Sequence, residues 1–217
     1  MIDLTKYNTI IFDCDGVILN SNFKKIEAYR NAALAYGASA KQAEALVKYH
    51  VELTGISRNI KFKYFLKEIM CEEVTEQSMN KLINSLNDQV IHLLKDCEVT
   101  SGLTELKNKT NNISWMVASG GDQDEIRYLF KKNKIDLFFS EGIYGSPSSK
   151  HEIIEKKLKN HNFLPALFLG DSLYDIQTAK KYDLDFVFIY GWTDLEEWEK
   201  VCADYGLDYI EKVKDLI

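Results

Sequence analysis

The sequence predicts an α/β fold in which a doubly wound parallel sheet carries an inserted helical domain. Beyond residue 98, short apolar runs alternate with amphipathic helical patterns, and this alternation is typical of a parallel sheet covered on both faces. Roughly 100 residues separate the first two apolar runs, far more than an ordinary crossover needs. The excess therefore predicts a separate domain inserted into the sheet domain.

The strong strand candidates are short apolar runs bounded by polar or turn-forming residues, at 9–12, 114–118, 166–169 and 186–189. Weaker candidates lie at 137–139 and 142–144. Helical patterns at 123–132, 150–158 and 174–182 separate the later runs. Because crossovers between parallel strands are right-handed, this order predicts a doubly wound sheet.

The inserted segment shows four stripes of apolar residues at the spacing of amphipathic helices, beginning at Phe23, Ala43, Phe62 and Met79. No strand candidate interrupts them, so we expect a small helical bundle. The bundle leaves the sheet just after Asp15 and returns near Val99. We therefore expect residues 20–97 to lie over the sheet edge as a lid, and residues 1–19 and 98–217 to form the sheet domain.

The composition argues against several classes of partner. The formal net charge is −6 and no long basic run occurs, so nucleic acid and anionic membranes are not expected partners. No apolar stretch reaches membrane-spanning length, and residues 1–7 lack the pattern of a secretion signal. The cysteines are scattered without a C-x-x-C pair, at positions 14, 71, 97 and 202. We expect reduced thiols and a cytoplasmic location.

Two carboxylates, Asp13 and Asp15, end the first strand candidate, and Gly16 follows them. The carboxyl end of a strand is where open α/β sheets bind ligands. Two anions this close repel each other unless a cation or a shared proton intervenes, although an ordinary solvated turn is the alternative. Cys14 between them is a poor candidate nucleophile, because the carboxylates would suppress its thiolate.

Two further motifs follow β-type segments and lead into helices. Backbone N–H groups at Ser119-Gly120-Gly121, in front of a helix, can form an anion site; the alternative is that Ser119 or Asp122 simply caps that helix. Lys150 opens another predicted helix, where the macrodipole does not favour a cation. Phosphate binding would explain why a lysine stands at a helix start. The alternative is that Lys150 is a solvated surface residue.

A second pair of acids, Asp171 and Asp175, follows the strand candidate at 166–169. One helical turn separates them, so both can face one centre, and carboxylate oxygens of this kind suit Mg²⁺. The alternative is a helix cap at Asp171 and a surface acid at Asp175. In a parallel sheet, all four motifs would meet at the same edge.

These four motifs, in this order and across essentially the whole chain, resemble those of the haloacid dehalogenase superfamily. The size and placement of the helical insertion resemble members with a C1-type cap, the phosphoglycolate phosphatase and β-phosphoglucomutase group. The resemblance implies a Rossmann-like core domain and a Mg²⁺-dependent phosphomonoesterase. Such an enzyme would hydrolyse a small phosphorylated metabolite, such as a sugar phosphate or phosphoglycolate, through an aspartyl-phosphate.

The resemblance also implies the roles of individual residues. Asp13 would be the nucleophile, and Asp15 would act first as general acid and then as general base. The implied magnesium ligands are Asp13, the backbone carbonyl of Asp15, Asp171 and, directly or through water, Asp175. The residues implied to hold the phosphoryl group are Ser119, Gly120 and Lys150.

Departures from related subgroups narrow the expected reaction. Dehalogenating and phosphonate-cleaving members lack the second acid of the first motif, so Asp15 disfavours both activities. No histidine occurs before His50, which weakens the resemblance to β-phosphoglucomutases. A phosphomutase, and a non-catalytic phosphosugar-binding protein on the same scaffold, remain the alternatives.

Residues 54–62 resemble the cap loop through which C1 members reach into the site. Arg58 could bind a substrate carboxylate or a second phosphate in a bidentate manner, and Lys61 is a lesser candidate for the same role. The alternative is a helix start capped by Ser57, with Arg58 in solvent.

Overall fold

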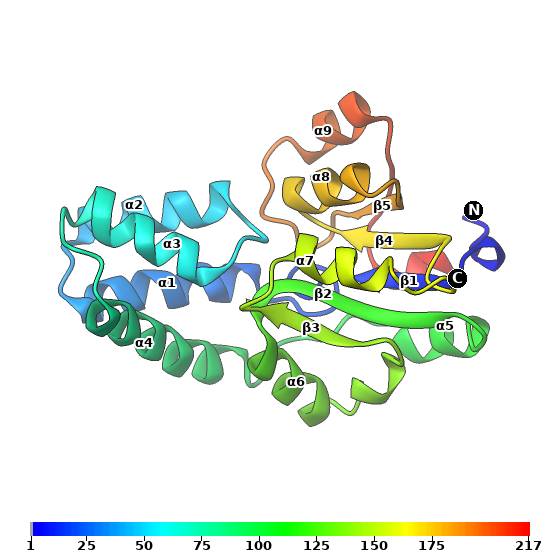
Figure 1. Cartoon of the computed structure of the whole chain (residues 1–217), viewed down its shortest axis with the longest axis horizontal. Coiled ribbons are helices and arrows are strands. Elements are labelled where there is room, and N and C mark those ends of the chain that lie inside the picture. Colours follow the sequence, from blue (N-terminus) through cyan, green and yellow to red (C-terminus); the bar gives the residue numbers. More distant parts are fainter. Residues whose placement is uncertain (1) are drawn as a thin grey trace.

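A six-stranded sheet forms the centre of the larger part of the molecule (Figure 1). The computed structural model describes residues 2–217, so Met1, the first residue of the predicted sheet domain, lies outside the described residues. The strand order is β3-β2-β1-β4-β5-β6, and all neighbours run parallel. The strands are β1 (Thr9–Phe12), β2 (Ser114–Asp122), β3 (Gly142–Ser146), β4 (Ala166–Gly170), β5 (Asp185–Ile189) and β6 (Asp208–Ile210).

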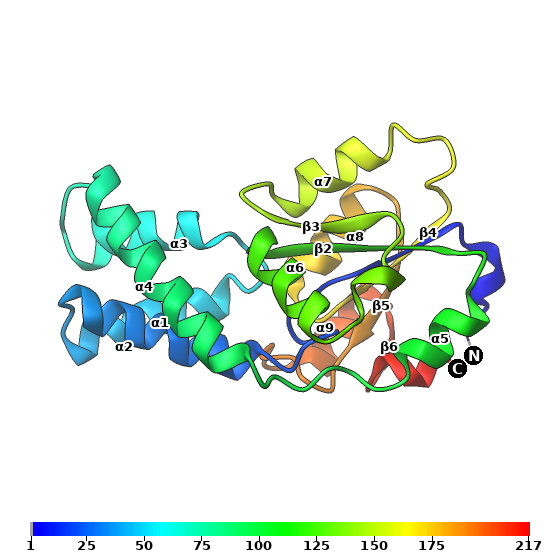
Figure 2. The same cartoon turned by 90° about the horizontal axis from the view of Figure 1, so that it is seen from below.

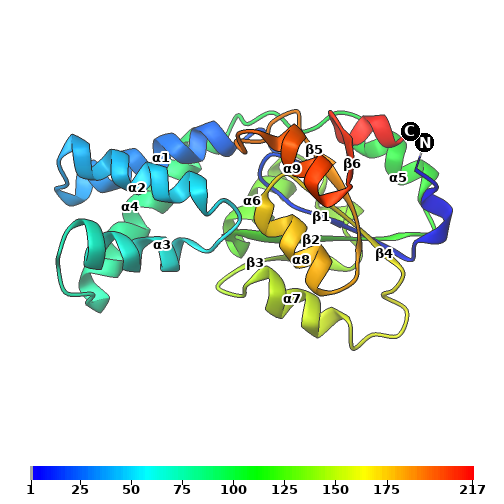
Figure 3. The same cartoon turned by 90° about the horizontal axis from the view of Figure 1, so that it is seen from above.

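Helices cover both faces of this sheet, as the prediction of a doubly wound fold requires. One face carries α5 (Leu103–Lys109) and α6 (Gln123–Lys132), seen from below in Figure 2. The other carries α7 (Lys150–Lys157), α8 (Leu173–Lys181) and α9 (Trp198–Tyr205), seen from above in Figure 3. Short 3₁₀ turns complete this part of the chain, η1 (Leu4–Lys6), η3 (Asp136–Phe138) and η4 (Val213–Leu216).

The strands are apolar on both faces because each face packs against helices. Phe12 of β1 points to the α5–α6 side, where its ring centroid lies 4.7 Å from that of Trp115. Its neighbour Ile11 points to the other side and packs in a separate cluster with Ile154 of α7. Successive side chains of a strand alternate in this way, which explains the unbroken apolar runs in the sequence.

Four helices without a strand make up the inserted segment, on the left of Figure 1. They are α1 (Asn22–Tyr36), α2 (Ala40–Glu52), α3 (Arg58–Tyr64), continued by a π-helical turn η2 (Phe65–Ile69), and α4 (Glu76–Leu94). Two chain connections join the insertion to the sheet, and they lie side by side because Leu19 forms a β-bridge with Val99. The division at 19/20 and 97/98 stays a prediction. Among residues 2–217, no helix is both long enough and apolar enough to cross a bilayer.

Two sequence-based expectations are wrong in detail. The strand candidate at 137–139 is instead part of a 3₁₀ turn, in which Phe139 is buried against Phe130 while Leu137 is 89% exposed. The first apolar stripe of the insertion was expected to bury Phe23. Instead, Phe23 is 69% exposed, and the buried side of the helix at this end carries Asn22 and Lys25. The start of α1 faces the edge of the sheet, and polar residues occupy its buried side there.

The order of the strands reverses direction between β1 and β4. Open α/β sheets bind ligands in the crevice that such a reversal creates at the carboxyl ends of the strands. Asp13 follows β1 and Asp171 follows β4, so the topology places both acids at this crevice.

Candidate active site

Three buried carboxylates, those of Asp13, Asp171 and Asp175, meet at the crevice, with oxygen atoms within 4.8 Å of one another. The N–H of Asp13 donates to the carbonyl of Leu169 at 2.9 Å, which ties the end of β1 to β4. Asp175 lies in the first turn of α8, and Ser172, which caps this helix, donates its hydroxyl to Asp175 Oδ2 at 2.6 Å. The alternative interpretation, in which Asp171 caps this helix and Asp175 is a surface acid, is therefore wrong.

Lys150 is the cation among these carboxylates. Its Nζ lies 2.9 Å from Asp13 Oδ1 and also donates to Asp175 Oδ1. Burial acts to lower the pKa of Lys150, but the two carboxylates outweigh it and raise that pKa. The lysine is the first residue of α7, after a capping box formed by Ser149 and Glu152. The ion pairs explain why a cation occupies a helix start.

The carboxylates outnumber this cation. Burial raises the pKa of Asp13 to about 8, with Lys150 opposing the shift and Asp175 adding to it. Burial and the neighbouring carboxylates also raise the pKa of Asp171 well above its usual value. Among the described residues, Asp171 Oδ1 is buried without a hydrogen-bond partner. This oxygen is therefore free to bind a further cation.

The chain comes very close to Asp171 at Gly16. A β-carbon on Gly16 would lie 1.9 Å from Asp171 Oδ2, and the residue has φ +76°. Both the space and the backbone conformation require glycine here. The turn at Gly16 takes the chain away from the strand directly after Asp15.

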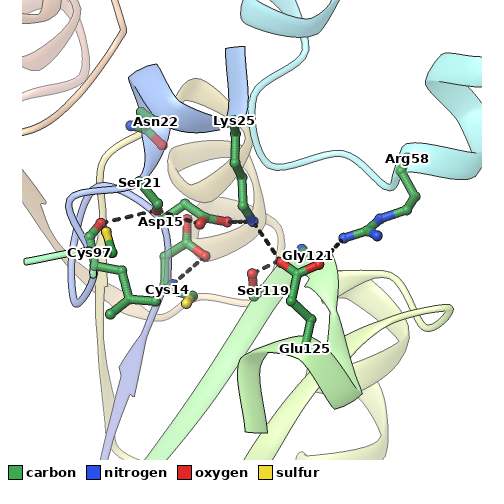
Figure 4. A network of polar contacts seen from close by, with 12 residues as sticks. Cys14, Asp15, Ser21, Asn22, Lys25, Arg58, Cys97, Ser119, Gly121 and Glu125 are labelled. Atoms are coloured by element: carbon green, nitrogen blue, oxygen red, sulfur yellow. Dashed lines mark hydrogen bonds and ion pairs between the residues drawn. The ribbon is translucent and has the colours of Figure 1, made fainter. Parts of the chain in front are cut away.

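Asp15 has partners of its own. Ser21 Oγ donates to Asp15 Oδ1 at 2.5 Å, and Lys25 Nζ donates to Oδ2 at 2.6 Å (Figure 4). Burial acts to raise the pKa of Asp15, but Lys25 and the hydrogen bonds outweigh it and lower that pKa. The carboxylate of Asp15 thus belongs to a second group of charges, and metal binding through its carbonyl stays a prediction.

The Ser119 motif lies at the end of β2, which extends to Asp122 rather than ending at residue 118 as expected. Ser119 is buried, and its Oγ accepts from the N–H of Gly121 at 3.0 Å. Asp122 caps α6 by accepting from two N–H groups. A β-carbon on Gly120 would lie 2.0 Å from the carbonyl oxygen of Gly55 in the cap loop. The cap is therefore in direct contact with this motif, whose phosphate binding stays a prediction.

Both cap cations predicted to face the substrate are buried. Arg58 Nη2 lies 2.8 Å from Glu125 Oε2 of α6, and its Nη1 donates to Asn87. Ser57 caps α3 as the alternative predicted, but Arg58 is not in solvent. Lys61 donates to His50 Nδ1 at 2.8 Å and to the His50 carbonyl at 3.3 Å. Burial and the nearby Lys25 lower the pKa of Lys61 to about 7.

The sequence reasoning missed Asn22, Lys25 and Glu125. Asn22 Nδ2 donates to Asp171 Oδ2 at 2.8 Å, and Lys25 holds Asp15. Ala28, Tyr29 and Ala32 are buried, and steps of three and four residues back from them reach Lys25 and Asn22. That phase was a usable signal. No sequence signal pointed to Glu125, because an acidic residue in the first turn of a helix is common.

A cavity of about 40 Å³ lies between the sheet edge and the cap. The sheet side contributes Asp13, Asp15, Gly120 and Gly121, and the cap side contributes Lys25, Arg58 and Lys61. A larger groove of about 1020 Å³ runs along β5 and β6. The carboxylate triad lies outside that groove, so the chemistry assigns the site to the smaller cavity.

Solved structures of other proteins share this fold. They include a hydrolase from Pseudomonas syringae, 19% identical with a TM-score of 0.73, covering 96% of this chain and 95% of that one. Another is described as a predicted phosphoglycolate phosphatase from Haemophilus somnus, 16% identical with a TM-score of 0.74, covering 99% and 98%.

Comparison with curated proteins gives no match. A sequence model of one family, described as haloacid dehalogenase-like hydrolase, matches residues 10–189. This match spans most of the chain and contains the motifs from Asp13 to Asp175. The chain therefore belongs to the haloacid dehalogenase-like hydrolase family.

Proposed function

We propose that this hydrolase is a Mg²⁺-dependent phosphatase that removes phosphate from a small phosphorylated metabolite through an aspartyl-phosphate at Asp13. The observation that carries the proposal is the buried triad of Asp13, Asp171 and Asp175, neutralised in part by Lys150. The likeness to a structure described as a predicted phosphoglycolate phosphatase supports the same class of reaction.

The triad fits a magnesium ion. Lys150 pairs with two of its three carboxylates, those of Asp13 and Asp175. Asp171 Oδ1 has no hydrogen-bond partner among the described residues. Mg²⁺ prefers oxygen ligands with one or two carboxylates and several waters. Asp13, Asp171 and Asp175 would hold it, together with the carbonyl of Asp15. When bound, the ion would supply positive charge that reduces the repulsion between an anionic nucleophile and an anionic phosphate.

Asp13 is oriented for attack by contacts to one of its oxygens. The N–H of Cys14 donates to Asp13 Oδ1 at 2.7 Å, and Lys150 binds the same oxygen. These contacts leave Oδ2 to attack phosphorus. In the first step the bond from Oδ2 to phosphorus forms and the ester oxygen leaves. In the second step water attacks phosphorus, phosphate departs and the Asp13 carboxylate is restored.

Asp15 carries the proton in both steps. It would protonate the departing ester oxygen and then take a proton from the attacking water. The lowered pKa of Asp15 favours the basic form that the second step needs. A bound phosphate dianion would push this pKa upward, because like charges disfavour ionisation, and so favour the acidic form needed first.

Lys61, rather than Arg58, is the cap cation available to the substrate. Arg58 is paired with Glu125 and Asn87, whereas the contacts of Lys61 are a histidine nitrogen and a carbonyl. A buried ammonium group without an anionic partner is costly. The proposal is therefore that Lys61 binds a second anionic group, close to the phosphate in a cavity of about 40 Å³.

Removing the metal or the nucleophile should abolish the reaction. We expect Mg²⁺-dependent hydrolysis of p-nitrophenyl phosphate, its loss on chelation, and a fall in kcat of roughly 10³-fold or more for Asp13→Asn. Asp208→Asn, the same change on the exposed edge strand β6, is the matched control. Phosphate release that survives both treatments contradicts the proposal, and isomerised sugar phosphate without phosphate release indicates a mutase.

Metal binding should also change how the free energy of unfolding depends on pH. A carboxyl group with a raised pKa holds its proton in the folded state at pH values where the unfolded state has lost it. The free energy of unfolding therefore falls as pH rises from about 4 toward the folded pKa, by up to about 1.4 kcal/mol per pH unit per group. We expect metal-free Asp171→Asn to lose less stability than wild type between pH 5.5 and 7.5.

Urea unfolding with and without Mg²⁺ measures both effects. Magnesium should stabilise the wild type more at pH 7.5 than at pH 5.5, because only deprotonated carboxylates bind it. The Asp171→Asn variant should gain little. Parallel pH profiles for the two proteins, together with equal magnesium effects, would argue against metal binding at the triad.

Replacing Lys61 should discriminate between substrates. We expect Lys61→Met to raise KM about tenfold or more for a phosphomonoester with a carboxylate next to the phosphate, because a charged contact is lost. For an uncharged ester, KM should change less than about threefold. Lys63→Met, an exposed lysine on the same helix, is the control. Equal changes for both esters rule out this role of Lys61.

A further inference from the structure

Glu125 joins the cap to the sheet domain through two cations at once. Its Oε2 lies 2.8 Å from Arg58 Nη2 of α3, and its Oε1 lies 3.7 Å from Lys25 Nζ of α1 (Figure 4). The side chains of all three are at most 10% exposed. Among the described residues, Oε1 has no hydrogen-bond partner. Glu125 is thus a buried carboxylate with one strong ion pair and one incomplete contact.

Lys25 stands between two carboxylates. It lies 2.6 Å from Asp15 Oδ2 and 3.7 Å from Glu125 Oε1. A β-carbon on Gly121 would lie 3.0 Å from its Nζ, so the position of this ammonium depends on the bare backbone of the β2 motif. Because Arg58 already satisfies one oxygen of Glu125, the shorter and stronger bond of Lys25 goes to Asp15.

The pair between Arg58 and Glu125 crosses from the cap to the sheet domain. Arg58 follows the cap loop whose Gly55 carbonyl touches Gly120, and the adjacent Ser57 Oγ lies 2.9 Å from Ser146 Oγ of the sheet domain. Lys25 instead lies near the start of α1, about 6 Å along the helix from Ser21 at the connection. Opening the cap separates Arg58 from Glu125 while Lys25 stays nearby.

We propose that Glu125 is a positioning residue that makes the orientation of Asp15 depend on closure of the cap. With the cap closed, Arg58 forms an ion pair with Glu125, and Lys25 forms an ion pair with Asp15. With the cap open, Glu125 loses Arg58, and the neighbouring Lys25 is the cation that remains beside it, so Glu125 draws Lys25 away from Asp15. This inference rests on the proposed function, in which Asp15 moves the proton. It restricts proton transfer to the closed, water-excluding state.

A double-mutant cycle tests the inference with glycerol 2-phosphate and Mg²⁺. Arg58→Met leaves Glu125 free to take Lys25, so kcat should fall about tenfold or more with a smaller change in KM. Glu125→Gln removes the competing charge and should lower kcat by a few fold. In this background, adding Arg58→Met should cost less than about twofold. This result would show that Arg58 acts through Glu125. A purely structural ion pair would give the same coupling, so a comparison of two leaving groups separates the two roles.

The leaving group supplies a second readout. p-Nitrophenol departs with little need for a proton, so Arg58→Met should lower kcat/KM several-fold less for p-nitrophenyl phosphate than for glycerol 2-phosphate. Arg58→Lys keeps a cation near Glu125 and should retain much of kcat, which guards against a variant that fails to fold. Arg30→Met breaks an ion pair with Glu44 on the cap surface and is the matched control in both backgrounds.

The possible outcomes are distinguishable. An unchanged kcat in Arg58→Met, an equal loss in both backgrounds, or an equal loss for both esters overturns the role of Glu125 while leaving the phosphatase intact. A wild-type protein that hydrolyses neither ester overturns the proposed function, and this inference with it.

Discussion

Lys150 shares one positive charge between Asp13 and Asp175 at the carboxyl edge of the sheet, and the rest of the site depends on this pairing. Buried carboxylates are costly without a counter-charge, yet the strand order brings three of them together at the reversal between β1 and β4. One lysine cannot neutralise three acids. Burial, together with the excess negative charge, raises the pKa values of Asp13 and Asp171. The excess charge is the physical reason to expect a bound divalent cation.

A second group of charges extends from this edge into the cap. Asp15 pairs with Lys25, and Glu125 is shared between Lys25 and Arg58, so the seam between the two parts of the molecule is held by buried ion pairs rather than by apolar packing alone. Lys61 stands outside these pairs. Cations that are already in ion pairs, such as Lys25 and Arg58, can hold and orient groups of the protein. A cation outside any ion pair, such as Lys61, is available to bind a ligand.

Much of this arrangement was predictable from the sequence, for a physical reason. Asp13, Lys150 and Asp171 lie at the ends of apolar runs or the starts of helices, and strand ends in a parallel sheet converge, so local patterns were enough to bring them together. At the start of α1 the apolar pattern is misleading, because Phe23 is exposed and Lys25 is buried. Only the phase of Ala28, Tyr29 and Ala32, further along the helix, indicates that Lys25 is buried. The run at 137–139 is apolar for the packing of Phe139 and not for a strand. Glu125 acquires its role from partners in two other helices, which no local pattern contains.

We propose that Asp13, held by Lys150 beside the acidic triad, attacks phosphorus. The most direct measurement is a single turnover with Mg²⁺ and excess enzyme, quenched in acid within milliseconds and followed by peptide mass spectrometry. We expect a transient, acid-stable phosphoryl group on Asp13 that appears before free phosphate and disappears as phosphate is released. Phosphate formed with no covalent intermediate, or a phosphoryl group on another residue such as Cys14, would contradict it.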